Sequence, residues 1–116
     1  MKTIIAGSRG FNDYGLLCQI CKEELLTEVV SGTARGADQL GERYSDENGI
    51  PKKQFPADWD KYGKSAGYKR NTEMAKYADA LIAFWDGESR GTKHMIDLAK
   101  QHNLKTRVVI FNSPMR

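Results

Sequence analysis

The sequence lacks the features that mark membrane-spanning, exported and multidomain proteins. No apolar run approaches the roughly 18 residues of a membrane-spanning helix, which excludes an integral membrane protein. The apolar run at 3–6 is too short for a signal peptide, so we expect a cytoplasmic protein with no membrane partner. The chain of 116 residues contains no repeat, low-complexity tract or linker, so residues 1–116 are predicted to form a single domain.

Cysteine is scarce, with two residues, Cys18 and Cys21, spaced as C-x-x-C. This spacing is typical of a redox pair or of half a zinc site. A redox pair normally sits at a helix N-terminus, whereas both cysteines fall inside a predicted helix. A zinc site needs about four ligands, and only His94 and His102 remain, late in the chain. We therefore expect reduced structural thiols, no metal and no required cofactor.

Neither sign of charge dominates: 18 Lys and Arg face 15 Asp and Glu, for a net charge of +3. A duplex nucleic-acid surface usually has a denser basic stripe, so nucleic acid is not the expected partner. The stretches 7–13, 31–38, 61–71 and 86–93 hold eight basic and four acidic residues, hence +4, which leaves −1 for the rest of the chain. This distribution predicts a nearly neutral protein with a local anion pocket.

Short apolar runs alternate with helical periodicities along the chain. Strands are predicted at 3–6, 27–31, 51–55, 80–85 and 107–111, and helices at 13–26, 37–48, 66–77 and around 95–102. The segment 56–64 is polar and aromatic without periodicity and is predicted to be a loop. This order predicts a single Rossmann-like three-layer α/β/α sandwich, with about five mainly parallel strands flanked by helices. Ligands of such folds bind outside the carboxyl ends of the strands.

Four segments rich in glycine, hydroxyl groups and cations fall at that predicted edge. Glycine lets the backbone approach a ligand closely, and helix N-termini can hold phosphate. The candidate ligand-binding residues are Gly7, Ser8, Arg9, Ser31, Gly32, Thr33, Arg35, Gly36, Asp38, Lys69, Arg70, Asn71, Trp85, Asp86, Gly87, Ser89, Arg90, Gly91 and Thr92. The dinucleotide fingerprint G-x-G-x-x-G and the Walker A pattern are both absent, which disfavours an NTPase.

Structural interpretations of the same residues stay open. Segment 31–38 also fits a tight turn with a helix cap, Trp85 fits a core position, and Asp86 fits a turn cap as well as a ribose contact. Segment 61–71 fits a solvated loop and first helical turn. However, its cations oppose the dipole of the following helix, a cost that a bound anion would offset. This segment therefore favours the binding interpretation.

Taken together, four blocks resemble the small SLOG proteins of the YspA type. The blocks are 5–9, 31–38, 66–71 and 83–92, which cover almost the whole chain in order. These proteins form the YpsA-related branch of the SLOG superfamily, which also holds the LOG phosphoribohydrolases and the DNA-processing protein DprA. The resemblance implies a Rossmann-like fold, binding of a nucleotide or nucleotide-derived ligand, and a bacterial or phage source. Because relatives often dimerise, a homo-oligomer such as a dimer is an expectation.

The comparison with LOG enzymes is partial. Their loop P-G-G-x-G-T is followed closely by a catalytic glutamate. Gly91 and Thr92 match the end of that loop here, and Arg70 is the counterpart of a LOG arginine, but no acid follows until Asp97. The nearby substitutes are Glu73 and Glu88, neither at the LOG position.

Three functional hypotheses follow from these observations. The first is a binding protein for an ADP-ribose-like or cyclic-nucleotide-like ligand that acts as a sensor, carrier or sequestering protein. The second is a hydrolase of an N-glycosidic or phosphate bond, with Glu88 or Glu73 as acid or base. The third is a single-stranded nucleic-acid binder that uses basic residues of the segment 61–71 together with Trp59.

Overall fold

The computed structural model describes residues 1–112, which form one five-stranded sheet. All strands are parallel, in the order β3-β2-β1-β4-β5. Their bounds are β1 Lys2–Gly7, β2 Glu28–Ser31, β3 Lys52–Gln54, β4 Ala80–Trp85 and β5 Lys105–Ile110. The apolar runs form the central strands β1 and β4 because parallel strands covered on both faces need apolar side chains on both.

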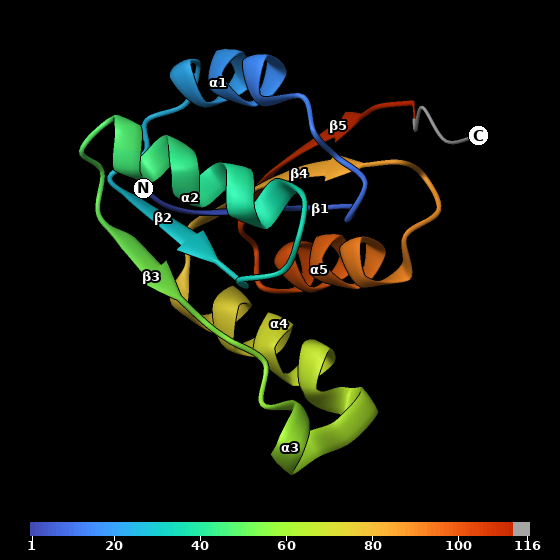
Figure 1. The fold of residues 1–116 in the computed structure, drawn as a ribbon. Helices are drawn as coiled ribbons and strands as arrows, with labels where there is room; N and C mark the ends of the chain where they lie inside the picture. The colour runs from blue at the N-terminus through green and yellow to red at the C-terminus, as the bar shows by residue number, and fades with distance from the viewer. Residues whose placement is uncertain (113–116) are drawn as a thin grey trace.

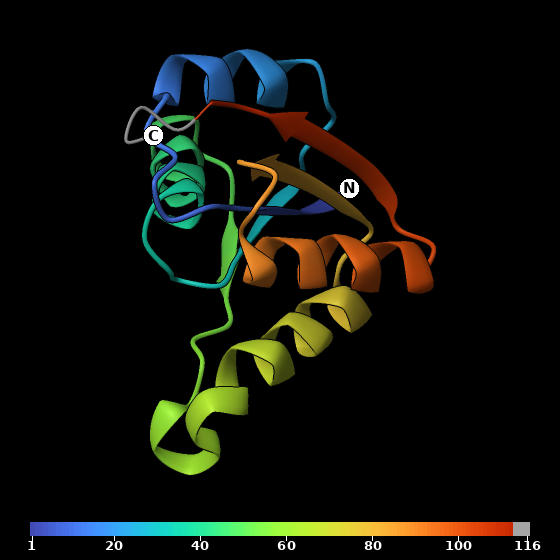
Figure 2. The same ribbon diagram turned by 90° about the vertical axis from the view of Figure 1, so that its right-hand side faces the viewer.

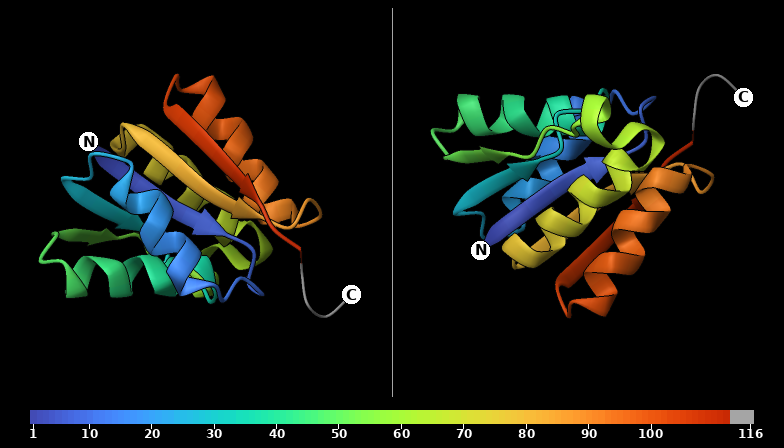
Figure 3. Two further views of the ribbon diagram at one scale, coloured as in Figure 1. Left: turned by 90° about the horizontal axis from the view of Figure 1, so that it is seen from above. Right: turned by 90° about the horizontal axis from the view of Figure 1, so that it is seen from below.

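Helices cover both faces of the sheet (Figures 1 and 3). On one face lie α1 (Tyr14–Lys22) and α2 (Ala37–Glu47), and on the other lie α4 (Ala66–Tyr77) and α5 (Arg90–Gln101). The short helix α3 (Trp59–Tyr62) projects beyond the sheet at the far end of α4 (Figure 2). The predicted Rossmann-like α/β/α sandwich is therefore confirmed.

Two apolar cores hold the helices to the sheet, and adjacent residues of one strand serve opposite cores. Ile4 of β1 packs in the core that includes Met74 of α4 and Met95 of α5. Its neighbour Ile5 packs in the core that includes Leu17 of α1. Because β1 and β4 are fixed from both sides, the loops at their carboxyl ends start from rigid positions.

The order of the strands creates a switch point between β1 and β4. The chain runs outward from β1 through β2 to β3, then returns to pair β4 with the other side of β1. Crossovers on either side of this point put their loops on opposite faces, which opens a crevice at the carboxyl edge. None of the helices within residues 1–112 is long and apolar enough to cross a membrane.

Most predicted boundaries agree closely with the structure. The helix 66–77 and the strand 80–85 coincide with α4 and β4. Asp13, the first residue of the predicted range 13–26, caps α1, since its Oδ1 accepts the N–H of Leu16 at 3.0 Å. Both cysteines lie inside α1, and burial raises the pKa of the Cys21 thiol to about 12.

Two local predictions are wrong. The first helix ends at Lys22 rather than at about 26, and Leu25, inside the predicted range, lies beyond the helix and is 87% exposed. The segment 56–64 is not a loop throughout, because it contains α3 and the start of a 3₁₀ helix over Gly63–Ser65. Asp58 caps α3 by accepting the N–H of Lys61 at 3.1 Å. A helix of one turn shows no periodicity that a sequence pattern can reveal.

Candidate ligand-binding site

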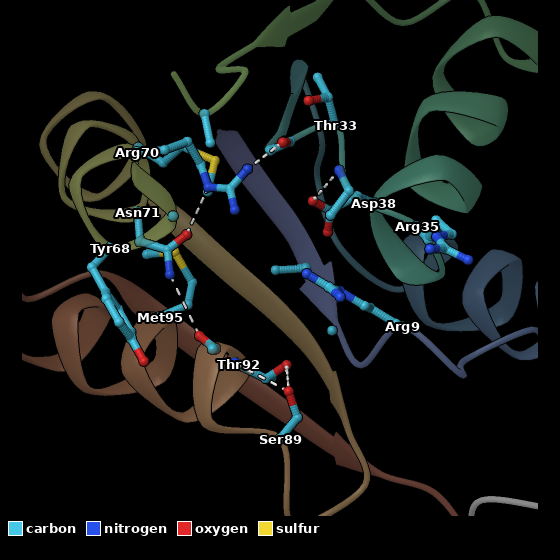
Figure 4. A pocket seen from close by; sticks show the side chains of 18 of the residues that line it. Arg9, Thr33, Arg35, Asp38, Tyr68, Arg70, Asn71, Ser89, Thr92 and Met95 are labelled. Carbon is cyan, nitrogen blue, oxygen red and sulfur yellow. Dashed lines mark hydrogen bonds between the residues drawn. The ribbon is translucent and has the colours of Figure 1, made fainter. Parts of the chain in front are cut away.

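A cavity of about 700 Å³ opens at the carboxyl edge of the sheet, beside the switch point between β1 and β4 (Figure 4). Its wall comes from the loops after β1 and β2, the segment 56–59, α4 and the first turns of α5. Segments far apart in the sequence thus meet at one place. A cavity of this size accommodates a small molecule or cofactor.

The structure brings eleven of the predicted site residues to the cavity wall. These are Gly7, Arg9, Gly32, Thr33, Arg35, Asp38, Arg70, Asn71, Ser89, Gly91 and Thr92. The other predicted site residues lie near the same edge without lining the cavity: Ser8, Ser31, Gly36, Lys69, Trp85, Asp86, Gly87 and Arg90.

Positive charge dominates this cavity. Four cationic side chains line it, those of Arg9, Arg35, Lys64 and Arg70, against one carboxylate among the described residues, that of Asp38. The excess of three positive charges equals the net charge of the whole chain, +3. The cavity thus gathers four of the eight basic residues of the four stretches 7–13, 31–38, 61–71 and 86–93.

Arg70 of α4 reaches across the cavity toward the loop after β2 (Figure 4). It donates hydrogen bonds to the Gly32 carbonyl oxygen and, from Nε, to Asn71 Oδ1 at 3.0 Å. Burial lowers the pKa of the Arg70 guanidinium, while Asp38 raises it and the positive charge of Arg9 lowers it further. Arg9 and Arg70 are thus like charges that repel each other in one partly desolvated space.

The loop after β2 is braced by the helix that follows it. Ser31 Oγ donates to Glu42 Oε2 at 2.6 Å and accepts the N–H of Thr33 at 3.0 Å. The N–H of Ala34 donates to Asp38 Oδ2 at 3.1 Å. Thr33 adopts a φ of 63°, a left-handed conformation that these hydrogen bonds hold in place.

Gly36 closes this loop against the loop after β1. It has a φ of +78°, and a Cβ at this position would lie 2.5 Å from the Ser8 carbonyl oxygen and 2.7 Å from that of Arg9. Only glycine fits between these backbones. Its role is therefore to bring Arg9 and Arg35 to the same side of the cavity.

Asp38 is the acidic group of the cavity and is 5% exposed. Burial raises the pKa of its carboxyl to about 6, against the opposing effects of the Ala34 hydrogen bond and the Arg70 charge. The carboxylate is therefore ionised at neutral pH and protonated in mildly acidic solution.

The loop after β4 is held by its own side chains. Asp86 Oδ1 accepts the N–H groups of Glu88 and Ser89, each at 2.8 Å, and Ser89 Oγ caps α5. Trp85 Nε1 donates to the Ser89 carbonyl oxygen at 3.0 Å, and its ring packs against a core. Ser8, which is buried, accepts the N–H of Asp86 through Oγ at 3.2 Å. In this loop the polar groups support the turn and the sheet edge.

Two aromatic side chains line the cavity instead of Trp85. Trp59 of α3 is 54% exposed, and Tyr68 of α4 is 45% exposed. The Tyr68 ring meets His94 edge-on at a centroid distance of 4.5 Å, and His94 Nδ1 lies 3.2 Å from Asn71 Nδ2. The position of Tyr68 inside the cationic segment 61–71 is the signal that points to it in the sequence.

The candidate catalytic acids lie elsewhere. Glu73 and Glu88 are both exposed, and neither is on the wall of the cavity. Within residues 1–112, no three His, Cys, Asp or Glu side chains gather so as to hold a metal ion.

Comparison with known proteins gives the family. A family model described as the YspA, cpYpsA-related SLOG family matches residues 1–62 of the 116. The chain belongs to this SLOG family. The "Gene 61 protein" of Mycobacterium phage D29 is 33% identical over 111 residues, which cover 86% of this chain and 89% of that protein. No solved structure matches the chain significantly.

The SLOG match and the cavity overlap only in part. The matching segment contains β1, β2 and β3, the loops that carry Arg9 and Arg35, and α2 with Asp38. The opposite wall, with Arg70 of α4 and Thr92 of α5, follows that segment. This SLOG protein thus builds its cavity from both parts of the chain. The phage relative agrees with the expectation of a phage or bacterial protein.

Proposed function

We propose that this SLOG protein binds an anionic, nucleotide-derived small molecule in the cavity at the carboxyl edge of its sheet. ADP-ribose-like and cyclic-nucleotide-like ligands are the candidate classes. The protein binds them as a sensor, carrier or sequestering protein. The supporting observation is that Arg9 and Arg70, two like charges, share one cavity with Arg35 and Lys64. A phosphate among these groups turns their repulsion into attraction.

The remaining wall suits the other parts of a nucleotide. Trp59 and Tyr68 present exposed rings on which a base can stack. Ser89 and Thr92 lie at the N-terminus of α5, where hydroxyl and backbone donors favour an anion. Cations, rings and hydroxyl groups in one cavity are the combination that a nucleotide requires.

Isothermal titration with ADP-ribose, NAD, AMP and cyclic AMP tests this proposal. We expect at least one of them to bind, and Arg9→Ala to weaken that binding about 10-fold, because a charge-assisted hydrogen bond to phosphate is lost. The control is Arg43→Ala, which removes an exposed arginine of α2 that pairs with Glu47 outside the cavity. Equal weakening by the two variants contradicts the proposal.

Mass spectrometry of small molecules that co-purify with the protein provides a second test. Denaturation of the purified protein, followed by mass spectrometry of the released small molecules, should give a phosphorylated species with nucleotide absorbance. Its yield should fall in the Arg9→Ala protein and stay the same in the Arg43→Ala protein.

Binding is favoured over a hydrolase that uses Glu73 or Glu88, because neither lines the cavity. A general acid or base must come within hydrogen-bond reach of the reacting group. Incubation with nucleoside monophosphates and chromatography of the mixture should therefore give unchanged substrate. Product formation that Glu88→Gln abolishes would instead support the hydrolase.

A further inference from the structure

Asp38 places one carboxylate in a cavity whose other charged side chains are cations. Asp38 lies in the first turn of α2, on the wall shared with Arg9, Arg35 and Arg70. Its negative charge would repel a phosphate placed against it. The part of the ligand that faces Asp38 is therefore neutral or cationic and donates a hydrogen bond.

The space in front of Asp38 is shared with Arg70. A Cβ built on Gly32 would lie 2.9 Å from Asp38 Oδ2 and 2.7 Å from Arg70 Nη1, so the two side-chain atoms lie close together beside this glycine, on the wall of the cavity. Within residues 1–112 Arg70 forms no ion pair with Asp38, and its hydrogen bonds go to Gly32 and Asn71. Figure 4 shows the two side chains facing each other across this part of the cavity.

A group that fits between them must donate toward Asp38 and accept from Arg70. A hydroxyl group does both, because it has one donor and two acceptor lone pairs. A phosphate has no donor to offer in its fully ionised form, and an apolar group would add no hydrogen bond to either charge.

We infer that Asp38 and Arg70 form a subsite for a hydroxyl group on the pentose of the ligand. This inference rests on the proposed function and refines it: the ligand is a ribose-containing phosphate rather than a deoxyribose one. The phosphate lies at Arg9 and Arg35, the base lies on Trp59 and Tyr68, and the pentose lies between them beside Gly32.

The test compares ribonucleotides with their deoxy analogues. AMP, 2′-deoxy-AMP and 3′-deoxy-AMP are titrated into the unchanged protein at about pH 7.5, where Asp38 is ionised. We expect at least one deoxy analogue to bind about 10- to 100-fold more weakly than AMP, since a hydrogen bond to a charged group is lost.

Two variants assign that preference to the subsite. Asp38→Asn removes the charge with little change of shape, and Gly32→Ala fills the space between Asp38 and Arg70 while keeping both side chains. Each should weaken AMP binding about 10-fold or more and bring AMP and the deoxy analogue within about 3-fold of each other. Asp46→Asn, an exposed acid on the same helix that pairs with Lys52, should keep the preference of the unchanged protein.

The outcomes separate this inference from the proposed function. If nucleotides bind and Arg9→Ala weakens their binding, but the unchanged protein does not prefer AMP over its deoxy analogues, the proposed function stands and the hydroxyl subsite is wrong. If Asp38→Asn alters the preference for AMP over inosine monophosphate instead, Asp38 contacts the base, and the inference is again wrong. If neither the adenosine monophosphates nor ADP-ribose binds, both fail. Thermal melting identifies a variant that does not fold, and Gly32→Ala then decides in place of Asp38→Asn.

Discussion

The loops after β2 and β4 are similar in composition and differ in what holds them. Each follows a parallel strand, contains glycine and a hydroxyl side chain, and leads into a helix. An arginine lies within the first loop, Arg35, and directly after the second, Arg90. In the loop after β2, the bracing groups are Asp38 and Glu42, which belong to the following helix. In the loop after β4, the bracing groups are Asp86 and Ser89, which belong to the loop itself.

This difference decides which side chains can meet a ligand. A loop braced by its helix leaves its own side chains to the cavity, and Thr33 and Arg35 both line it. In the loop after β4, Asp86 holds the turn and does not line the cavity, whereas Ser89 caps α5 and lines it. Loop composition alone therefore does not decide which side chains reach the cavity.

The largest expected difference between the two loops lies in their left-handed glycines. Gly36→Ala should lower the free energy of unfolding by about 2–4 kcal/mol, because its Cβ meets two carbonyl oxygens and its φ is +78°. Gly87→Ala should cost about 1 kcal/mol, because its φ is +82° but no heavy atom lies within 4 Å of the added Cβ. Urea unfolding of both variants measures this difference. Equal losses would contradict the close contact of the loops after β1 and β2.

Replacement of Arg35 and of Arg90 should have different effects on ligand binding. Arg35→Ala should weaken binding of ADP-ribose, or of whichever nucleotide the titrations identify, about 10-fold, because the lost cation lines the cavity. Arg90→Ala should change it less than about 2-fold, because this arginine lies outside the cavity wall. Calorimetric titration of the two proteins side by side measures the ratio. A larger loss for Arg90→Ala would reverse the assignment of the two loops.

Asp38, which braces the loop after β2, should give the free energy of unfolding a distinctive dependence on pH. The folded-state pKa of Asp38 is raised to about 6, so the folded protein binds more protons than the unfolded chain between about pH 4 and pH 6. Asp38 should therefore lower stability by about 1–3 kcal/mol as the pH rises through this range, with no further change above it.

Subtracting the stability of Asp38→Asn from that of the unchanged protein isolates this effect. Other carboxyls, such as Glu24 with its lowered pKa, contribute equally to both proteins and cancel. Denaturant unfolding from about pH 4 to pH 8 provides the measurement. Parallel curves for the two proteins would show that the Asp38 carboxyl is not desolvated in the fold.

The smallest expected difference between the two loops concerns Glu42 and Asp86, which hold them through hydrogen bonds. Glu42→Gln and Asp86→Asn should each cost about 1 kcal/mol of stability, because each weakens hydrogen bonds to a carboxylate. Only Glu42→Gln should also weaken nucleotide binding, by a few-fold, because Glu42 fixes Ser31 at the start of the cavity loop. Melting curves and titrations on the same samples measure both quantities. Weaker binding in Asp86→Asn would mean that Asp86 also positions ligand contacts.

Much of the fold can be predicted from the sequence, because its longer helices and strands have regular apolar patterns and are ended by glycine or polar residues. The helix at 66–77 and the strand at 80–85 have clear periodicity and limits, and both appear as predicted. The end of α1 and the single turn of α3 cannot be predicted in this way, because a few capping hydrogen bonds, rather than a periodic pattern, set them.

Part of the candidate site can be predicted from the sequence because of the topology of the sheet. Parallel strands bring their carboxyl ends to one edge, so Arg9, Arg35 and Arg70 could be grouped without knowing a single distance. Trp85 could not be assigned, because the direction of its ring depends on the core beneath the last residue of β4. Trp59 belongs to the one-turn helix that no pattern reveals, which is why its place at the cavity required the structure.

The central place of β1 also has a consequence for the order in which the protein matures during synthesis. Its first neighbour, β2, follows soon, but its second neighbour is β4, whose Phe84 lies opposite Gly7 in the sheet. A nascent chain that ends before β4 thus has an unpaired edge on its central strand and lacks the α5 wall of the cavity. A ligand that binds only the finished cavity stabilises complete molecules alone, so its concentration in the cell would favour mature protein over unfinished chains.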